Sequence, residues 1–328
     1  MIRPADNEPK WLEFYHQHIA PFWADSVEHI YLDAADGLRL FYAYHKVSDT
    51  APLLVISTGR IEAAIKYQEV IWELAQQGIS CAVIDHRGQG LSERMTKNSH
   101  QGHVANFRDF IDDFSVFMNH IDERFPKASR YALGHSMGGA ILSWACCEQD
   151  FKFKHLFLTA PMFGIRTAGI PAAIARAIAG AGRWLNETIA PDNPWYFLGM
   201  KDYIAIPFAE NVLTHSEQRY QVFREAYESE PRVKLGGPTF AWLHEALTTC
   251  KQLQGMGSQL KVTATLFNAG ADVVVSKKAQ QRFANNAGAN VEFRSIKGAK
   301  HELMMESDVY RQPIMDSIYA RLKSSDAQ

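Results

Sequence analysis

The sequence lacks an excess of charge of either sign. Its 328 residues include 34 lysines and arginines against 36 aspartates and glutamates, a net charge of -2. A chain with this balance offers no basic footprint for nucleic acid, so we expect no nucleic-acid partner. With 47% hydrophobic and 21% charged residues, the composition is that of a globular protein rather than a disordered or collagen-like one.

Cysteines are also few. Four of them in a chain of this length are too sparse for a disulfide framework, and none form a C-x-x-C pair that would indicate a metal site. We expect reduced thiols in a cytoplasmic protein, with no metal and no cofactor. The four are Cys81, Cys146, Cys147 and Cys250.

Long apolar runs are missing as well. The N-terminal twenty residues carry acidic side chains and two histidines where a secretory signal needs basic residues followed by an apolar run. The most apolar stretch, 169–185, is interrupted by Arg176 and Arg183 and is shorter than the ~20 apolar residues of a membrane span. We therefore expect neither a signal peptide nor a transmembrane helix.

What is present is an alternation of apolar runs and helical periodicity. Continuous apolar runs are typical of strands buried on both faces of a parallel sheet. Strands are predicted at 29–32 and 38–44 (as a hairpin), 52–57, 80–85, 131–133, 155–159, 261–267 and 290–296. Helices are predicted at 61–77, 107–121 (with Asn106 as N-cap), 137–148, 239–252, 276–285 and 307–321. This order predicts an α/β fold with a mostly parallel central sheet flanked by helices.

The alternation stops between Pro161 and Pro238. Seven prolines interrupt helical pieces there, and no buried strand is evident. We interpret residues 161–238 as a helical cap inserted into an α/β core made of residues 1–160 and 239–328.

The strongest motif is Gly134-His-Ser-Met-Gly138, between the strand 131–133 and the helix 137–148. It is G-x-S-x-G in the strand-turn-helix context that this pattern requires. The glycines let strand and helix approach closely while the serine hydroxyl projects from a tight turn. We therefore predict Ser136 as a catalytic nucleophile, against the alternative of a glycine-rich turn without chemistry.

A nucleophilic serine needs a base and an orienting acid, which on this fold follow the serine in the order acid, then histidine. Only His301 follows a late predicted strand, 290–296. Asp272 lies on a loop at the carboxyl end of the strand 261–267. We predict Ser136, Asp272 and His301 as the catalytic triad. The other candidates lie before a strand, in a helix or in the insertion: His155, His215, His244, Asp150, Asp192 and Asp202.

The oxyanion of the tetrahedral intermediate needs two N–H donors. The residue after the nucleophile, Met137, supplies one, and the Arg60 amide, in the loop after the strand 52–57, supplies the other. The side chain of Arg60 is a separate candidate, for binding a substrate phosphate. The alternative is a surface or ion-pair arginine at the start of a helix.

Competing motifs fail on their spacing. The third glycine of a dinucleotide fingerprint beginning at Gly88 would fall at Glu93, and two His-Glu pairs have Thr248 and Met305 where H-E-x-x-H needs histidine. His100-x-x-His103 has no further ligands nearby, which favours a loop role over a metal site.

These residues together resemble the α/β-hydrolase superfamily, within it the monoacylglycerol lipase and lysophospholipase group, and most closely the bacterial lysophospholipases of the L-two type. The resemblance covers almost the whole chain, and Thr58-Gly59 stands where related lipases carry His-Gly, a departure shared by the lysophospholipase branch. It is carried by Thr58-Gly-Arg-Ile-Glu62 with Lys66-Tyr67, Ile84-Asp-His-Arg-Gly-Gln-Gly90, Gly134-His-Ser-Met-Gly138, and Lys300-His301-Glu302.

The resemblance implies hydrolysis of the fatty-acyl ester of a lysophospholipid, together with acyl transfer, by a bacterial enzyme that is cytoplasmic and peripheral on the inner membrane. From the residues alone, a monoacylglycerol lipase, a general carboxylesterase and a catalytically inactive lipid-binding hydrolase fold stay open. An intact Ser, Asp and His set favours an enzyme.

The insertion offers one more observation. Ile174, Ile178 and Leu185 fall on one face of a predicted helix, with Arg176 and Arg183 on the opposite face. Such a helix either packs its apolar face on the core or presents that face to a membrane or an acyl chain. Packing on the core is the more common arrangement.

Overall fold

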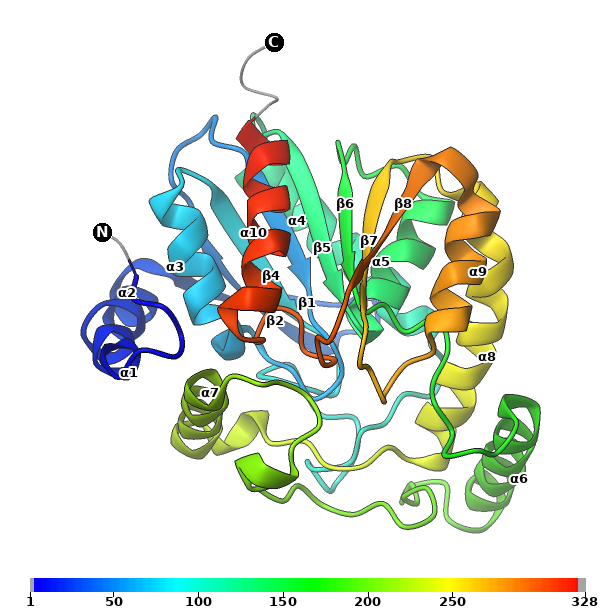
Figure 1. Cartoon of the computed structure of the whole chain (residues 1–328). Coiled ribbons are helices and arrows are strands. Elements are labelled where there is room, and N and C mark those ends of the chain that lie inside the picture. Colours follow the sequence, from blue (N-terminus) through cyan, green and yellow to red (C-terminus); the bar gives the residue numbers. More distant parts are fainter. Residues whose placement is uncertain (1–2, 324–328) are drawn as a thin grey trace.

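A computed structural model describes residues 3–323 and contains one eight-stranded sheet (Figure 1). Its strand order is β1-β2-β4-β3-β5-β6-β7-β8, with β2 antiparallel to both of its neighbours and the strands from β4 to β8 parallel. This confirms the predicted α/β-hydrolase fold. The strands are β1 (Glu28–Asp33), β2 (Arg39–His45), β3 (Leu53–Ser57), β4 (Ser80–Asp85), β5 (Arg130–His135), β6 (Leu156–Thr159), β7 (Ala264–Ala269) and β8 (Val291–Ile296).

Helices cover both faces of the sheet. Figure 1 shows α3 and α10 in front of it and α4 and α5 behind it, and α8 contacts both α5 and α9. The helices of the core are α3 (Gln68–Gln76), α4 (Arg108–Arg124), α5 (Met137–Glu148), α8 (Phe240–Met256), α9 (Lys277–Ala287) and α10 (Asp308–Lys323).

The helix α4 follows the predicted periodicity. Phe110, Ile111, Phe114, Phe117, Met118 and Ile121 are all buried against the sheet. The predicted N-cap is displaced by one residue, because the helix begins after Phe107. Asn106 still receives the Arg108 amide on its side-chain oxygen, at 2.9 Å, so it contributes to the start of the helix as its residue type predicts.

The predicted helix at 61–77 is wrong in its first half. Ile61 has φ 63°, and Ala63 is extended, so the chain turns sharply before the 3-10 turn η2 (Ala64–Tyr67) and the helix α3. The cause is local, because the Glu62 carboxylate accepts a hydrogen bond from the Gly59 amide and so closes a turn instead of opening a helix. Arg60 therefore lies on a loop rather than at a helix start.

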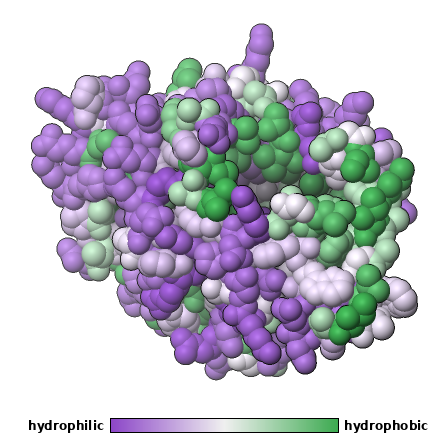
Figure 2. Space-filling model, turned by 90° about the horizontal axis from the view of Figure 1, so that it is seen from below, coloured by the Kyte–Doolittle hydropathy of each residue, from purple (hydrophilic) through white to green (hydrophobic). Residues whose placement is uncertain are grey.

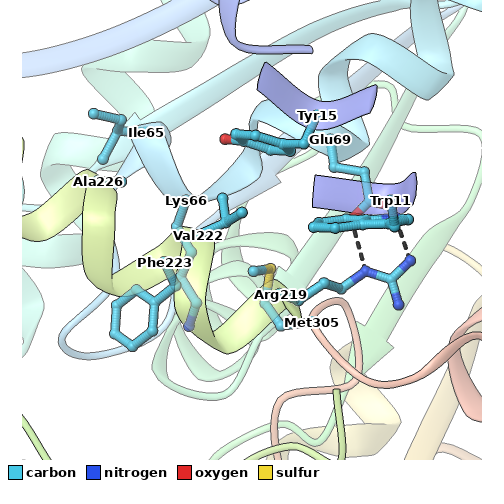
Figure 3. Close-up of a pocket in the computed structure, with 10 residues that line it drawn as sticks. All are labelled: Trp11, Tyr15, Ile65, Lys66, Glu69, Arg219, Val222, Phe223, Ala226 and Met305. Carbon is cyan, nitrogen blue, oxygen red and sulfur yellow. Dashed lines mark hydrogen bonds and ion pairs between the residues drawn. The ribbon is translucent and has the colours of Figure 1, made fainter. Parts of the chain in front are cut away.

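Residues 3–26 form short helices that the sequence did not predict: α1 (Lys10–Phe14), the π-helix η1 (Tyr15–Ile19) and α2 (Ala20–Ser26). They pack beside α3 and α7 (Glu217–Ser229), around the small cavity of Figure 3. Buried Arg219 of α7 donates to Glu69 at 2.7 and 2.8 Å and to Asp308 at 2.6 Å. Arg3 contacts the same two carboxylates, so ion pairs hold α7 and the N-terminal helices to the core.

The 161–238 segment lies across one edge of the sheet, at the bottom of Figure 1. It contains α6 (Ala172–Ile189), α7 and the 3-10 turns η3 (Phe208–Glu210) and η4 (Pro231–Val233), and none of its described residues belongs to a named strand. His100 and His103 were weighed above as metal ligands. His100 contacts this segment instead, and His103 contacts the N-cap of α8. His100 Nδ1 accepts from the Tyr203 amide at 3.1 Å, and His103 Nδ1 lies 3.0 Å from the Thr239 hydroxyl.

The helix α6 does not pack its large apolar side chains on the core, although that is the more common arrangement. Its buried residues are Ala175, Ala179 and Asn186, and a Cβ added at Gly182 would lie 2.2 Å from Phe240 of α8. These small side chains let α6 approach α8 closely, which leaves no room for large ones on that face. The large apolar side chains of α6 point outward instead. Ile174 is 52% exposed, Trp184 67% and Ile189 63%.

Candidate active site

Ser136 lies on the tight turn between β5 and α5. Its backbone has φ 49° and ψ -115°, a region that residues other than glycine rarely adopt, at a cost on the order of 1–3 kcal/mol. The glycines make the turn feasible. A Cβ at Gly138 would lie 2.0 Å from the Ser57 carbonyl oxygen, and one at Gly134 would lie 2.7 Å from the Cα of Gly139. The strand, turn and helix that the motif predicts are all present.

The three predicted triad residues meet at the carboxyl ends of β5, β7 and β8. His301 Nε2 lies 3.0 Å from Ser136 Oγ, and His301 Nδ1 lies 2.7 Å from Asp272 Oδ2. All three residues are buried. They are 29 and 165 residues apart along the chain, so only the fold brings them together. The arrangement lets His301 take a proton from Ser136 while Asp272 holds the other ring nitrogen.

Both carboxylate oxygens of Asp272 have hydrogen-bond partners. Its Oδ1 accepts the amides of Val274 at 2.6 Å and Val275 at 3.1 Å, which leaves Oδ2 for His301. Burial alone would raise the pKa of Asp272, but the hydrogen bond and charge of His301 and the two amides outweigh it and lower the pKa. Burial alone would lower the pKa of His301, but Asp272, Glu302 and Glu62 outweigh it and raise the pKa.

Two backbone amides are available beside the predicted nucleophile. Met137 is the first residue of α5, where N–H groups have no partner within the helix. Arg60 follows β3 on the loop 58–63, and β3 pairs directly with β5. Within residues 3–323, neither the Met137 nor the Arg60 amide donates to a protein acceptor. Both predicted donors are thus free to meet a developing oxyanion.

Comparison with known proteins places the sequence in a family. Residues 48–308 match the family Hydrolase_4, described as serine aminopeptidase, S33. The chain belongs to the Hydrolase_4 family. It is 34% identical to lysophospholipase L2 of Escherichia coli K12 over 92% of this chain and 88% of that protein. It is 26% identical to the monoglyceride lipase of Rattus norvegicus over 83% of this chain and 82% of that one.

A solved structure agrees on the fold of this Hydrolase_4 chain. A soluble variant of monoglyceride lipase from Saccharomyces cerevisiae superposes with a TM-score of 0.71, covering 91% of this chain and 96% of that one at 16% sequence identity. At that identity the likeness supports the α/β-hydrolase fold alone.

Next to the predicted triad of this Hydrolase_4 chain lies a buried group of charges. Lys66 Nζ donates to Glu62 at 2.9 Å and to Glu302 at 2.7 Å. Glu62, Glu302 and His135 place potential metal-ligand atoms within 4.8 Å of one another, but the Lys66 ammonium already lies between the two carboxylates. Sequence reasoning gave these residues no role. Two features of the sequence could have indicated this charged group: the four-residue spacing from Glu62 to Lys66, and the position of Glu302 next to His301.

The Arg60 side chain has no carboxylate partner among the described residues. Its Nη2 donates to the Gly236 carbonyl oxygen at 2.6 Å, its guanidinium lies 4.9 Å from the centre of the Trp242 ring, and its buried Nε has no hydrogen-bond partner. Burial lowers its pKa to about 10, so it is cationic at neutral pH. The ion-pair alternative is therefore wrong, and the guanidinium lies beneath the 161–238 segment.

The outer surface of that segment is unusually apolar. It carries eleven of the fifteen large hydrophobic side chains that are exposed in the described chain. Figure 2 shows this face of the Hydrolase_4 fold, with a hollow and hydrophobic side chains gathered beside it. We call these eleven the apolar surface: Ile170, Ile174, Ile178, Trp184, Leu185, Ile189, Leu198, Met200, Ile204, Ile206 and Val212.

His155, His215 and Asp202, three of the remaining candidates, have other partners. His155 lies within 2.9 Å of the hydroxyls of Thr263 and Thr265, and His215 is bound to Glu306 at 2.7 Å. Asp202 accepts from Tyr196 at 2.5 Å on the 161–238 segment. In these contacts they hold neighbouring strands and loops together.

Proposed function

We propose that this protein is a serine hydrolase that cleaves the fatty-acyl ester of lysophospholipids through an acyl-enzyme on Ser136. The observation that carries the proposal is the contact chain from Ser136 through His301 to Asp272. The identity to Escherichia coli lysophospholipase L2 supports the substrate class, and the identity to rat monoglyceride lipase supports monoacylglycerol as the second candidate.

In the proposed reaction, His301 Nε2 takes the proton of Ser136 Oγ as the oxygen attacks the ester carbonyl. The Met137 and Arg60 amides receive the oxyanion. The tetrahedral intermediate collapses when His301 returns the proton to the departing glycerol oxygen, which leaves an acyl ester on Ser136. Water, activated by the same histidine, then releases the fatty acid and restores the serine. If the hydroxyl of another lipid replaces water, the acyl group is transferred.

We propose residues 161–238 as the cap over this site, and the Arg60 guanidinium as the group that binds the phosphate of the substrate. An arginine without an anionic partner beneath a cap can supply charge-assisted hydrogen bonds to a phosphodiester, which a monoacylglycerol lacks.

The substrate class is tested by comparing Arg60→Met with wild type on two lipids of equal acyl chain. Methionine keeps an apolar stem against Trp242 and leaves the backbone amide intact. We expect kcat/KM for lysophosphatidylcholine to fall about ten- to one-hundredfold, the effect of a lost hydrogen bond to a charged group. For the monoacylglycerol it should change less than about threefold.

The matched control is Arg232→Met, an exposed arginine of the same segment that pairs with Glu230. It should leave both rates at the wild-type level. An equal loss on both lipids in Arg60→Met would remove the phosphate role and favour monoacylglycerol lipase, the second candidate function.

We also propose that the apolar surface touches the membrane from which the lipid is taken. Within residues 3–323, no helix combines the length and the apolarity needed to cross a bilayer. A helix with large apolar side chains on one exposed face can instead lie in the interface. Because the apolar surface belongs to the cap, a molecule bound through it would turn the hollowed face of Figure 2 toward the lipid.

The membrane contact is tested with the double variant Trp184→Gln/Ile189→Gln. Each lost side chain should cost ~1 kcal/mol of partial burial, so binding to phosphatidylcholine vesicles should weaken by roughly thirtyfold in a sedimentation assay. The control is Val47→Gln, which removes an exposed valine whose amide is bound to Ser80 at the opposite edge of the sheet. If the double variant binds vesicles like wild type, the apolar surface does not mediate the contact.

A further inference from the structure

The buried group of Glu62, Lys66 and Glu302 joins the two loops that flank the nucleophile. Glu62 and Lys66 follow β3, on the chain segment that begins with the oxyanion loop 58–60. Glu302 directly follows His301. The exposed fractions of the three residues are only 2%, 7% and 8%, so the ammonium and the two carboxylates stabilise one another in place of solvent.

The Glu62 carboxylate uses both oxygens to hold the oxyanion loop. Oε2 accepts the Gly59 amide at 2.5 Å and the Tyr67 hydroxyl at 2.8 Å, and Oε1 accepts Lys66 Nζ at 2.9 Å. A Cβ on Gly59 would lie 2.8 Å from the same Oε2, so the carboxylate lies directly beneath the loop. The position of the Arg60 amide, one residue on, therefore depends on Glu62.

Glu302 anchors the other loop. Its Oε2 accepts Lys66 Nζ at 2.7 Å, across 236 residues of sequence, and its amide donates to the Leu213 carbonyl of the cap at 2.9 Å. Phe223 of α7 closes over the ammonium, which lies 4.9 Å from the ring centre, and Figure 3 shows Lys66 beside this ring. The Lys66 ammonium thus contacts residues of three segments: the segment after β3, the loop that carries His301, and the cap.

The same group contributes to the electrostatics around His301. Asp272, Glu302 and Glu62 are the anions that raise the pKa of this histidine, and Lys66 partly neutralises the two glutamates. His135 lies next to it, with ring centres 5.0 Å apart. His135 Nδ1 donates to the Thr159 carbonyl at 3.0 Å, and burial lowers its pKa, so it is neutral beside the catalytic ring.

We propose that Glu62, Lys66 and Glu302 are positioning residues for the reaction: they fix the Arg60 amide relative to His301 and set the charge beside that histidine. The inference rests on the proposed function, because it assigns the three residues a role in the same site. It also accounts for a lysine buried between two glutamates where apolar side chains would fill the space at lower desolvation cost.

The first test is Glu62→Gln, assayed on the soluble ester p-nitrophenyl butyrate. Glutamine has one acceptor oxygen for the three donors that Glu62 satisfies, so at least one donor must face its NH2 group. We expect kcat to fall about ten- to one-hundredfold, part of what an oxyanion donor contributes, with KM changed less than twofold.

The matched control is Glu69→Gln, which alters a similarly buried glutamate, 4% exposed, that pairs with Arg219 and Arg3 rather than with Lys66. It should lower the melting temperature while kcat stays within about threefold of wild type. An equal loss of kcat in Glu69→Gln would overturn the inference, because the loss would then report a general loosening of the fold.

The second test is Glu302→Gln, which keeps the backbone bond to Leu213. His301 must be neutral to accept a proton, so activity is expected to fall when the pH drops below the pKa of His301. Removing an anion that raises this pKa should move the acid limb of the kcat/KM profile to lower pH, by about half a unit or more. A purely structural glutamate would leave the limb where it is.

Wild-type kcat in folded Glu62→Gln, or an unmoved acid limb in Glu302→Gln, overturns the inference. If Glu62→Gln does not fold, the acid limb of Glu302→Gln decides alone. Hydrolysis by the wild type separates a failure of the proposed function from a failure of the positioning roles. An inactive wild type contradicts the proposed function, whereas an active wild type with unaffected variants contradicts only the positioning roles.

Discussion

Ser136→Ala is expected to lower kcat for ester hydrolysis by about five orders of magnitude, because the substitution removes the only atom that attacks the ester carbonyl in the proposed reaction. The fold should be unaffected. The turn at φ 49° is no more strained for alanine than for serine, and the glycine contacts that permit it are unchanged. The measurement is fatty-acid release by purified protein whose circular dichroism and melting temperature match wild type.

A fluorophosphonate probe gives an independent readout of the same residue. It should label wild type and leave Ser136→Ala unlabelled. The control is Ser143→Ala, on the same helix, where a buried hydroxyl has no hydrogen-bond partner and lies outside the triad. That variant should retain labelling and turnover. A wild type that neither reacts with the probe nor hydrolyses any lipid would favour the inactive lipid-binding alternative.

Asp272→Asn is expected to lower kcat by up to about ten-thousandfold through the tautomer of His301. The side-chain oxygen of asparagine can keep the amide bonds of Val274 and Val275, which turns its NH2 group toward His301 Nδ1. That nitrogen must then accept a hydrogen bond, so the proton moves to Nε2, which can no longer take the proton of Ser136. The imidazolium also loses its neighbouring anion.

Asp202→Asn is the control for the acid. Asp202 is exposed on the cap and bound to Tyr196 and Asn98 rather than to His301, so its variant should turn over like wild type. If Asp202→Asn were the inactive protein and Asp272→Asn the active one, the assignment of the acid to the loop after β7 would be wrong.

The tight turn that holds Ser136 could be predicted because its surroundings are local in the sequence. Gly134, Gly138 and Gly139 and the flanking periodicities specify a strand, a tight turn and a helix within a few residues. The predicted acid and base followed from a general rule. Loops at the carboxyl ends of parallel strands share one edge of the sheet, so Asp272 and His301 were expected to meet Ser136 without any knowledge of distances.

Other features could not be predicted because they depend on particular side-chain contacts. The turn at Ile61 reflects the Glu62 carboxylate that holds the nearby Gly59 amide. The Arg60 guanidinium reaches the Gly236 carbonyl rather than an acid among the described residues. Neither is visible in helical periodicity, which predicted one continuous helix through this segment.

The sequence by itself determined the α/β order of elements, the turn that holds Ser136 and which side chains share each face of α6. The tertiary structure decided which of those faces is covered. Periodicity determines which side chains share a face, but burial depends on the surface that packs against that face. Phe240 of α8 leaves no room for a Cβ at Gly182, so α6 buries small side chains such as Ala175 and Ala179. The large apolar face of α6 was left to solvent. Likewise, contacts across 236 residues set Lys66 between its two glutamates, because only a folded core removes the water that would otherwise separate these charges.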